Sequence, residues 1–341
     1  MVHKWFFPAC LSAMLAASGS FAGTFDEAGV SASFLKVATG ARGSAMGEAF
    51  SSVADDSSAL FWNPAGLASV KKNELQVSHN QWLSDIKMDH FMVAIPAGGT
   101  WGLAWSALDL GEFAEWAGPG SVTGRTFTVN DQIFTFGYGN SFFAEMLQLG
   151  ASGKYIRENL GGGVGGQTFT MDLGATYIPW SMIPGVNISA VAQNLGGELS
   201  GFELPFGLRL GASARTESIF RKALSPVPVE VGGEKVHKFV YPWEVENNES
   251  GDLFISSIEV LVPKTGRSEL HMGMEYWLSF VAIRAGYRYR FPRNDLGGLS
   301  GLTLGLGIRG RSFQFDYGFD YAYAPYGDLG DASRFSVLVA F

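Results

Sequence analysis

From Lys72 onward, apolar and polar side chains alternate over long runs, and this alternation limits the fold of the chain more than any other feature. Residues 269–290 show it best. Apolar side chains occupy the even positions 270–276 and the odd positions 281–289, and the positions between them include Glu269, His271, Glu275, Arg284, Arg288 and Arg290. A period of two is typical of β-strands, so these runs predict a hairpin whose acidic and basic side chains share one face. We therefore predict a charge network of Glu269, His271, Glu275, Arg284 and Arg288 on this face. In the barrel predicted below, this face lines the lumen.

The same pattern recurs along residues 73–341 and divides them into an even number of strands. The predicted strands begin near Glu74, Ile86, Thr100, Asn130, Met146, Gln167, Gly185, Pro205, Asp252, Arg267, Ser279, Ser300, Arg311 and Ala332. Many of these runs are about 9 to 11 residues long, the length of a tilted membrane strand, whereas strands of soluble proteins average about 5 to 6 residues. The sequence predicts an all-β transmembrane barrel of about fourteen antiparallel strands.

Connection lengths and the C-terminus favour a barrel of a bacterial outer membrane. Short connections on one side alternate with longer ones on the other, as in outer-membrane barrels. The longer ones are predicted at residues 111–129, 159–167, 291–299 and 324–331. The last strand ends on Phe341 and resembles the assembly signal of such barrels. The predicted localisation is the outer membrane of a Gram-negative-type bacterium, with outer-membrane lipid as a partner.

Composition argues against two other classes of protein. Charged residues make up only 16% of the chain, below the roughly one quarter of soluble domains, but no stretch after the N-terminus provides the roughly 20 apolar residues of a membrane helix. The net charge of −8 offers no basic patch for nucleic acid, which we exclude as a partner.

Residues 1–22 have the pattern of a signal peptide. Lys4 precedes an apolar run, and the small residues Ser20 and Ala22 suit cleavage before Gly23. Cleavage also removes Cys10, the only cysteine, so no disulfide is predicted in the mature chain.

Residues 23–72 lack the alternation and are predicted to form a partly helical N-terminal plug in the lumen. A barrel of this size would conduct solutes unless something filled it, and this segment is the part of the chain available. Apolar residues at 46, 49, 50 and 53 have helical spacing, and Ser44 is a candidate N-cap, so a short helix is predicted there. Residues 34–38 fit either a helical turn or an extended piece.

Residues 55–68 carry the most specific local signals of the plug. Asn63 is a predicted N-cap, Pro64 suits the first helical turn, and Gly66 permits a turn. For Asp55 and Asp56, capping of a helix N-terminus is favoured over binding of a cation.

Two motifs in the plug resemble the N-terminal signature of the PorV/PorQ family of outer-membrane proteins, within the wider FadL-like superfamily. They are residues 40–50 (GARGSAMGEAF) and residues 53–67 (VADDSSALFWNPAGL). The resemblance implies a fourteen-stranded barrel with an N-terminal plug. It also implies two competing functions. PorV proteins take cargo from the type IX secretion translocon for surface attachment, whereas FadL proteins pass long-chain fatty acids and other hydrophobic molecules across the outer membrane.

The predicted function is a type IX secretion-associated barrel that binds a translocon or cargo protein through its outer loops. The alternative is a FadL-like channel for long-chain fatty acids or other hydrophobic small molecules, which should also have a break in one barrel wall. Gating by the plug is assigned to Leu35, Phe50, Asp55, Asp56, Phe61, Trp62, Asn63, Pro64, Ala65 and Gly66, with residues 63–66 as the hinge.

No catalytic, cofactor or metal site is predicted, and the chain is not expected to be an enzyme. Residues 305–310 match the dinucleotide fingerprint, but their glycines fall on the polar face of a strand that no helix follows. Residues 215–251 form a long insertion with a small hairpin predicted around residues 229–240. Two alternatives for this insertion are weighed equally. It is either a solvent-exposed loop with no further role or a docking site for a partner.

Overall fold

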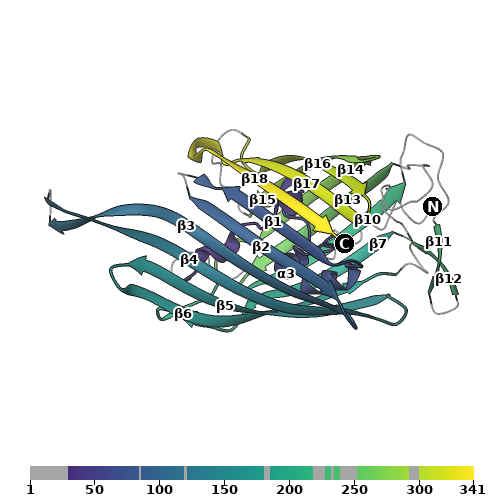
Figure 1. The fold of residues 1–341 in the computed structure, drawn as a ribbon, viewed down its shortest axis with the longest axis horizontal. Coiled ribbons are helices and arrows are strands. Elements are labelled where there is room, and N and C mark those ends of the chain that lie inside the picture. The colour runs from purple at the N-terminus through teal and green to yellow at the C-terminus, as the bar shows by residue number, and fades with distance from the viewer. Residues whose placement is uncertain are drawn as a thin grey trace.

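The structure, a computed structural model, is a closed antiparallel barrel of fourteen strands around a segment of the N-terminal region (Figure 1). It describes residues 30–83, 86–118, 121–179, 185–217, 227–231, 234–238, 252–291 and 299–341. The predicted fold class is confirmed. The signal peptide predicted at residues 1–22 lies outside the described residues.

The strands follow one another around the wall in chain order, and the first pairs with the last. They are β1 (Glu74–Gln81), β2 (Lys87–Pro96), β3 (Thr100–Gly118), β4 (Ser121–Phe142), β5 (Leu147–Gly161), β6 (Val164–Tyr177), β7 (Val186–Leu195), β10 (Gly207–Glu217), β13 (Leu253–Pro263), β14 (Glu269–Leu278), β15 (Val281–Arg290), β16 (Leu302–Ser312), β17 (Phe315–Pro325) and β18 (Asp331–Ala340). β1 closes on β18 from the pair Glu74–Ala340 to the pair Gln81–Ser333.

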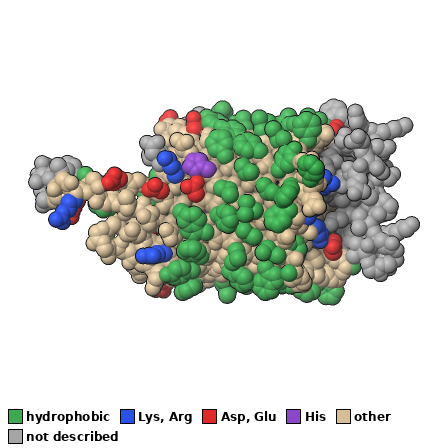
Figure 2. All heavy atoms as spheres, in the orientation of Figure 1, with side chains coloured by type: hydrophobic (Ala, Val, Ile, Leu, Met, Phe, Trp, Pro, Cys, Tyr) green, Lys and Arg blue, Asp and Glu red, His purple; other side chains and the backbone are tan. Residues whose placement is uncertain are grey.

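The alternation separates an apolar outer surface from a lumen lined by small and polar side chains. Leu103 on β3 is 54% exposed and Val337 on β18 is 48% exposed, whereas their chain neighbours Ala104 and Ser336 face inward and are buried. On the face shown in Figure 2, hydrophobic side chains gather in a broad band across the barrel. Such a band suits contact with lipid hydrocarbon.

The hairpin of β3 and β4 corrects the loop predicted at residues 111–129. The two strands continue to Gly118 and from Ser121, so they extend well past the rest of the barrel (Figure 1). Pairs such as Phe113–Phe127 maintain the ladder beyond a bulge after Asp109, because aromatic and β-branched residues favour strands. We name this the hairpin end of the barrel and the opposite end, where β18 finishes, the C-terminal end. The loop predicted at residues 159–167 is likewise mostly strand, since Gly161 pairs with Val164.

Two short hairpins lie in the connections around β10. β8 (Glu198–Leu199) pairs with β9 (Phe202–Glu203) in the connection from β7. β11 (Val227–Val231) pairs with β12 (Glu234–Lys238), which confirms the hairpin predicted around residues 229–240. This second hairpin lies at the C-terminal end, within the long connection from β10 to β13 (Figure 1).

Residues 30–73 enter the lumen as short helical pieces joined by turns. These are η1 (Ser33–Lys36), α2 (Ala41–Ala45), α3 (Ala59–Trp62) and η2 (Pro64–Ser69). η1 shows that the undecided residues 34–38 begin as a helical turn. In the parts of the chain that the structure describes, no helix has the length and apolar character needed to span a membrane.

The helix predicted after Ser44 is wrong. α2 ends at Ala45, and Gly47 and Glu48 then take positive φ angles of 63° and 64°, which interrupt a right-handed helix. Met46, Phe50 and Val53 are nevertheless buried, so the apolar spacing marks the buried side of a series of turns.

Candidate functional site: the plug and the lumen cavities

The Asn63 side chain links separate parts of the plug to the wall. Its Oδ1 accepts a hydrogen bond from Ala65 N (3.1 Å), and Pro64 opens η2, so the predicted N-cap is confirmed. Its Nδ2 donates to Ser51 O (2.7 Å) and to Thr176 Oγ1 on β6 (2.9 Å). The Asn63 side chain is fully buried, so its partners cannot bond to water instead. Because an amide both donates and accepts hydrogen bonds, it satisfies Ala65 N, Ser51 O and Thr176 Oγ1 together.

Glycines on the inner face of β3–β6 let the plug backbone touch the wall. A Cβ atom at Gly150 would lie 2.3 Å from the carbonyl atoms of Pro64, closer than real Cβ contacts. The same crowding by plug atoms holds at Gly102, Gly137, Gly139 and Gly174. Gly66 has a related role within the plug, since its Cβ would lie 2.2 Å from Ala54 O. Glycine at position 66 therefore permits the close approach of the Ala54 carbonyl. Its φ angle is not among the positive ones, so a left-handed turn is not the reason for glycine here.

Arg42 joins the plug to the opposite wall through buried ion pairs. Its Nε and Nη2 each donate to Glu275 on β14 at 2.9 Å, and its Nη1 lies 2.6 Å from Asp55 Oδ1 and 3.3 Å from Asp56 Oδ2. Glu275 also accepts from Arg284 Nε at 2.5 Å. Buried charges are costly unless they are paired and well hydrogen-bonded, and the bidentate Arg42–Glu275 geometry meets this condition.

The side chains of the predicted charge network all lie on the lumen side, in two groups. Arg284 connects Glu275 to Asp320 on β17 with an Nη1–Oδ1 distance of 2.9 Å. In the second group, His271 Nε2 lies 3.1 Å from Glu269 Oε2.

Arg288 pairs instead with Glu48 of the plug, its Nη1 lying 2.6 Å from Glu48 Oε1. Glu48 lies outside the membrane-spanning strands. Burial, the largest single influence, would raise the pKa of its carboxyl group, but the combined attraction of Arg288, His271 and Arg209 outweighs burial and holds that pKa below its ordinary value.

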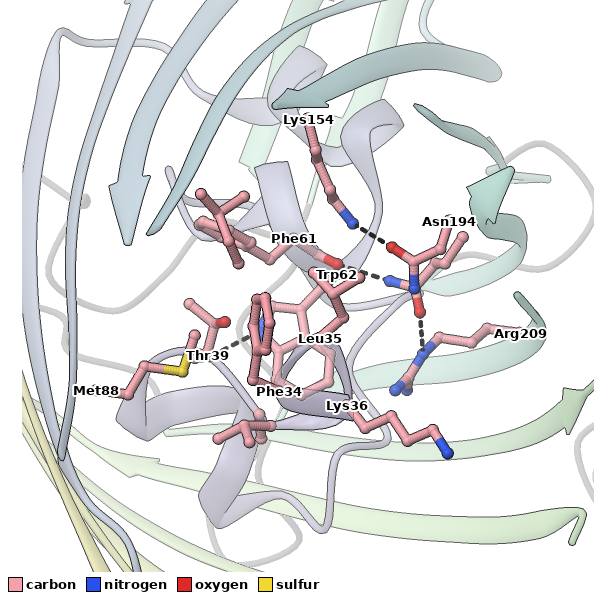
Figure 3. A pocket seen from close by; sticks show the side chains of 14 residues that line it. Phe34, Leu35, Lys36, Thr39, Phe61, Trp62, Met88, Lys154, Asn194 and Arg209 are labelled. Atoms are coloured by element: carbon pink, nitrogen blue, oxygen red, sulfur yellow. Dashed lines mark hydrogen bonds between the residues drawn. The ribbon is translucent and has the colours of Figure 1, made fainter. Parts of the chain in front are cut away.

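A cavity of about 40 Å³ with one apolar and one polar side lies beside η1 and α3 (Figure 3), and we call it the apolar cavity after its first side. Its apolar lining consists of Phe34, Leu35, Val37, Ala38, Phe61, Trp62, Met88 and Ile133. Polar side chains face it from the other side, where Lys154 Nζ donates to Asn194 Oδ1 at 3.0 Å (Figure 3). Trp62 is held at the cavity by its Nε1, which donates to Thr39 O at 2.9 Å.

A wider cavity of about 380 Å³ adjoins the apolar one at the hairpin end, and Leu35, Lys36, Gln193, Asn194 and Arg209 line both. Its charged lining is mainly basic, with Lys36, Arg209, Arg267, Arg288 and Arg290 against Glu48 and Glu269. Within the described parts of the chain, the exposed Lys36 ammonium has no hydrogen bond or ion pair. We call this cavity the basic vestibule.

A third cavity of about 90 Å³, the lower cavity, lies between the plug and the C-terminal end. Plug residues 52–55 line it from one side, and Asn187 of β7 and Arg215 of β10 line it from the other. Arg215 Nη2 lies 2.7 Å from Asp55 Oδ2 at its edge.

The residues predicted to gate the plug separate into three environments. Leu35, Phe61 and Trp62 line the apolar cavity. Phe50 is fully buried against Trp62, with ring centroids 5.8 Å apart. Pro64 and Ala65 are buried against the glycine-lined wall, and Gly66 is buried against Ala54 within the plug.

The two predicted capping acids differ. Asp56 forms a turn just before α3, since its Oδ1 accepts from Ser58 N at 2.9 Å, but Ser58 is the N-cap residue and α3 has no side-chain cap. Asp55 instead forms ion pairs with Arg42 and Arg215, which corrects its assignment as a cap.

Sequence reasoning missed Arg42, Glu48 and Arg209 as members of the site. Arg42 and Glu48 interrupt small and apolar residues within the recognised motif at 40–50, which was the available signal. Arg209 occupies an inward position in the alternation of β10, and its Nη1 pairs with Glu259 of β13.

The barrel wall is closed, and one of its irregularities lies between β6 and β7. The register shifts between Met171 and Leu173, and Asn194 takes a positive φ of 56°. Asn194 N donates to Asp172 Oδ1 at 2.8 Å, and Lys154 pairs with Asp172 at 2.6 Å. Polar side chains therefore occupy this irregular point, and among the described residues the closed wall has no break of the kind that the channel alternative predicts.

A family model matches the N-terminal third of the chain. The model of an Uncharacterised protein family (UPF0164) matches residues 11–118, less than half of the chain. No curated protein matches the chain.

The chain is similar to several solved structures of channels and transporters. The chain is similar to the TodX deltaS2S3 mutant, a monoaromatic hydrocarbon channel, with a TM-score of 0.52 at 11% identity, over 89% of this chain and 98% of that one. The toluene transporter TbuX of Ralstonia pickettii has a TM-score of 0.47 at 13% identity, over 89% and 97% of the two chains. A FadL homologue of Pseudomonas aeruginosa has 0.44 at 12%, over 89% and 98%. At such low identity, the TodX likeness establishes a common fold.

Proposed function

We propose that this chain is an outer-membrane channel that admits small hydrophobic molecules. The observation that carries the proposal is the apolar cavity at Phe34, Phe61 and Trp62. The interior of an outer-membrane barrel is ordinarily polar, so aromatic and aliphatic side chains around a cavity there favour an apolar ligand. The apolar outer belt and the fold shared with TodX support the same proposal.

Among hydrophobic molecules, those with an acidic head group fit the cavities best, as long-chain fatty acids do. Lys36 and Arg209 line both the apolar cavity and the basic vestibule. The apolar cavity of about 40 Å³ would have to widen to take an apolar tail, and the tail would then place a carboxylate within the field of the vestibule cations, where its charge is stabilised.

Uptake measurements test this proposal. Cells that lack their own transporter, with and without this protein, are supplied with a radiolabelled long-chain fatty acid or radiolabelled toluene. We expect the protein to raise uptake of the fatty acid, and Lys36→Ala to lower it several-fold without changing uptake of toluene. Lys72→Ala, which changes a surface lysine paired with Asp316, serves as the matched control. Uptake of both compounds equal to that of cells without the protein would refute the proposal.

A second candidate function is the docking of a protein partner, such as a secretion translocon or its cargo. The feature that favours it is the β3–β4 hairpin, which extends past the barrel and exposes Phe113 stacked on Phe127 with ring centroids 5.9 Å apart. A variant that joins Gly111 to Thr128 removes this extension. Crosslinking in intact outer membranes should recover a partner with the full chain and lose it with the variant. Recovery of the same proteins with both would count against this function.

A further inference from the structure

A molecule in the apolar cavity still has to pass the plug to reach the C-terminal end. We propose that this passage follows β7, along the seam where Asn187, Ser189 and Gln193 meet the plug. The inference rests on the proposed function and assigns a route within it. Three observations support it. Two sides of the barrel hold the plug by ion pairs or direct backbone contact, β7 holds it by neutral hydrogen bonds, and cavities lie at both ends of the β7 seam.

Two sides of the plug are fixed to the wall. On the β14–β17 side, Arg42 and Glu48 form buried ion pairs with Glu275 and Arg288. On the β3–β6 side, the Pro64 backbone lies directly against Gly150. Neither side leaves space for a molecule to pass without loss of buried charge pairs or of backbone contact.

β7 holds the plug differently. It has no glycine over its length, and its hydrogen bonds to the plug are between neutral groups. Asn187 Nδ2 donates to Ser52 O (3.1 Å), Ser189 Oγ lies 2.8 Å from Ser51 Oγ, and Gln193 Nε2 donates to Phe61 O (2.7 Å). Such bonds exchange readily with water, whereas a separated buried ion pair leaves charges uncompensated.

The cavities meet the two ends of this seam. Gln193 lines the apolar cavity and the basic vestibule, and Asn187 lines the lower cavity. Inward-facing Val191 lies between Ser189 and Gln193, which adds an apolar surface to the path. Release of the three neutral contacts would therefore join the cavities without disturbing Arg42 or Pro64.

Charged contacts border the seam on β10, the neighbour of β7, and on β13 beyond it. Ser51 N donates to Glu259 Oε2 of β13 at 2.9 Å, and Arg215 of β10 pairs with Asp55 at the lower cavity. Asp55 also contacts Arg42, so it remains paired on the fixed side when the seam opens.

A disulfide across the seam tests the route. Ser51→Cys with Ser189→Cys introduces two thiols where the hydroxyl oxygens lie 2.8 Å apart, and the predicted mature chain has no other cysteine. The matched control is Ala41→Cys with Ala322→Cys, two fully buried alanines that pack together on the fixed side. Disulfide formation is followed by electrophoretic mobility, and uptake of the radiolabelled fatty acid is measured before and after reduction.

We expect the oxidised Ser51–Ser189 variant to lose at least ten-fold in uptake and to regain it on reduction, while the oxidised control transports like the unmodified protein. Unchanged uptake by the oxidised seam variant would overturn the β7 route, and so would loss of uptake in both oxidised variants, because the whole plug would then have to move. If the unmodified protein itself shows no uptake, the proposed function fails instead.

Discussion

Arg42 is the residue at which the internal contacts of the plug and its contacts with the wall converge. One guanidinium binds Glu275 of the wall with two nitrogens and Asp55 and Asp56 of the plug with the third. It also lies over the ring of Phe50, 5.2 Å from the centroid. A lysine cannot reproduce this arrangement, because its single ammonium lacks the planar fork of donors.

We expect Arg42→Met to lower the free energy of unfolding by about 3 to 5 kcal/mol, the usual cost of removing one partner from a buried ion pair. Urea titration of the protein in lipid vesicles measures the change. Lys72→Ala is the control, since Lys72 and Asp316 form an exposed pair worth about 0 to 1 kcal/mol. Equal stability of the Arg42→Met variant and the unmodified protein would contradict the role given to Arg42.

The pair of Glu48 and Arg288 predicts a loss of stability in acid. A carboxyl group whose pKa is lowered by folding stabilises the protein fully above its unfolded pKa, about 4.3 for glutamate, and this contribution is lost as the pH falls through the folded pKa. Protease cleavage of the plug should therefore increase below about pH 4. Glu48→Gln should be more susceptible already at pH 7 and should change less between pH 7 and pH 3. A steeper change in the variant would show that other groups control the response.

At the scale of elements, η2 and β5 require glycine where their backbones meet. Gly150→Ala places a methyl group 2.3 Å from Pro64, and we expect a loss of about 1 to 3 kcal/mol in stability, as for other overpacked sites. Gly153→Ala on the same strand is the matched control, because its Cβ would meet nothing within 4 Å. Unfolding in urea compares the two variants. A similar loss in both would indicate that strand propensity, not contact with the plug, determines the effect.

The barrel strands were predictable because their alternation is a local property of the sequence. The same period places Glu275 and Arg284 opposite each other in the hairpin of β14 and β15, as the register shows. The plug was less predictable, because its turns depend on the surrounding wall. Met46 and Phe50 keep helical spacing although Gly47 and Glu48 break the helix, and nothing local to Arg42 identifies Glu275 as its partner.

At the scale of the molecule, we expect the plug to determine whether the barrel conducts. Deletion of residues 30–70 removes the plug and leaves the pairing of β1 with β18 intact. We expect this variant to form a barrel with a large, steady conductance in planar bilayers, because a lumen of this width otherwise fills with water. The full chain should show little conductance. The same small conductance in both would mean that the strands' own side chains close the lumen.

The resemblance of residues 40–50 and 53–67 to PorV and PorQ proteins stays a prediction. These residues form the plug and its contacts, which a secretion barrel and a hydrophobic channel both need. A motif of this kind predicts how the lumen is closed. It does not identify the transported molecule. The cavities beside Trp62 depend on side chains from distant strands, such as Arg209, and so could not be located from the motif.

The ion pairs of the plug also constrain the order in which the protein is assembled. Arg42 and Glu275 are 233 residues apart in the chain, and Arg42 cannot meet its partner until most of the wall exists. Contacts between such distant residues form late, because a long loop must close first. A newly inserted barrel should therefore pass through a leaky stage in which its wall is complete and its plug is still unattached.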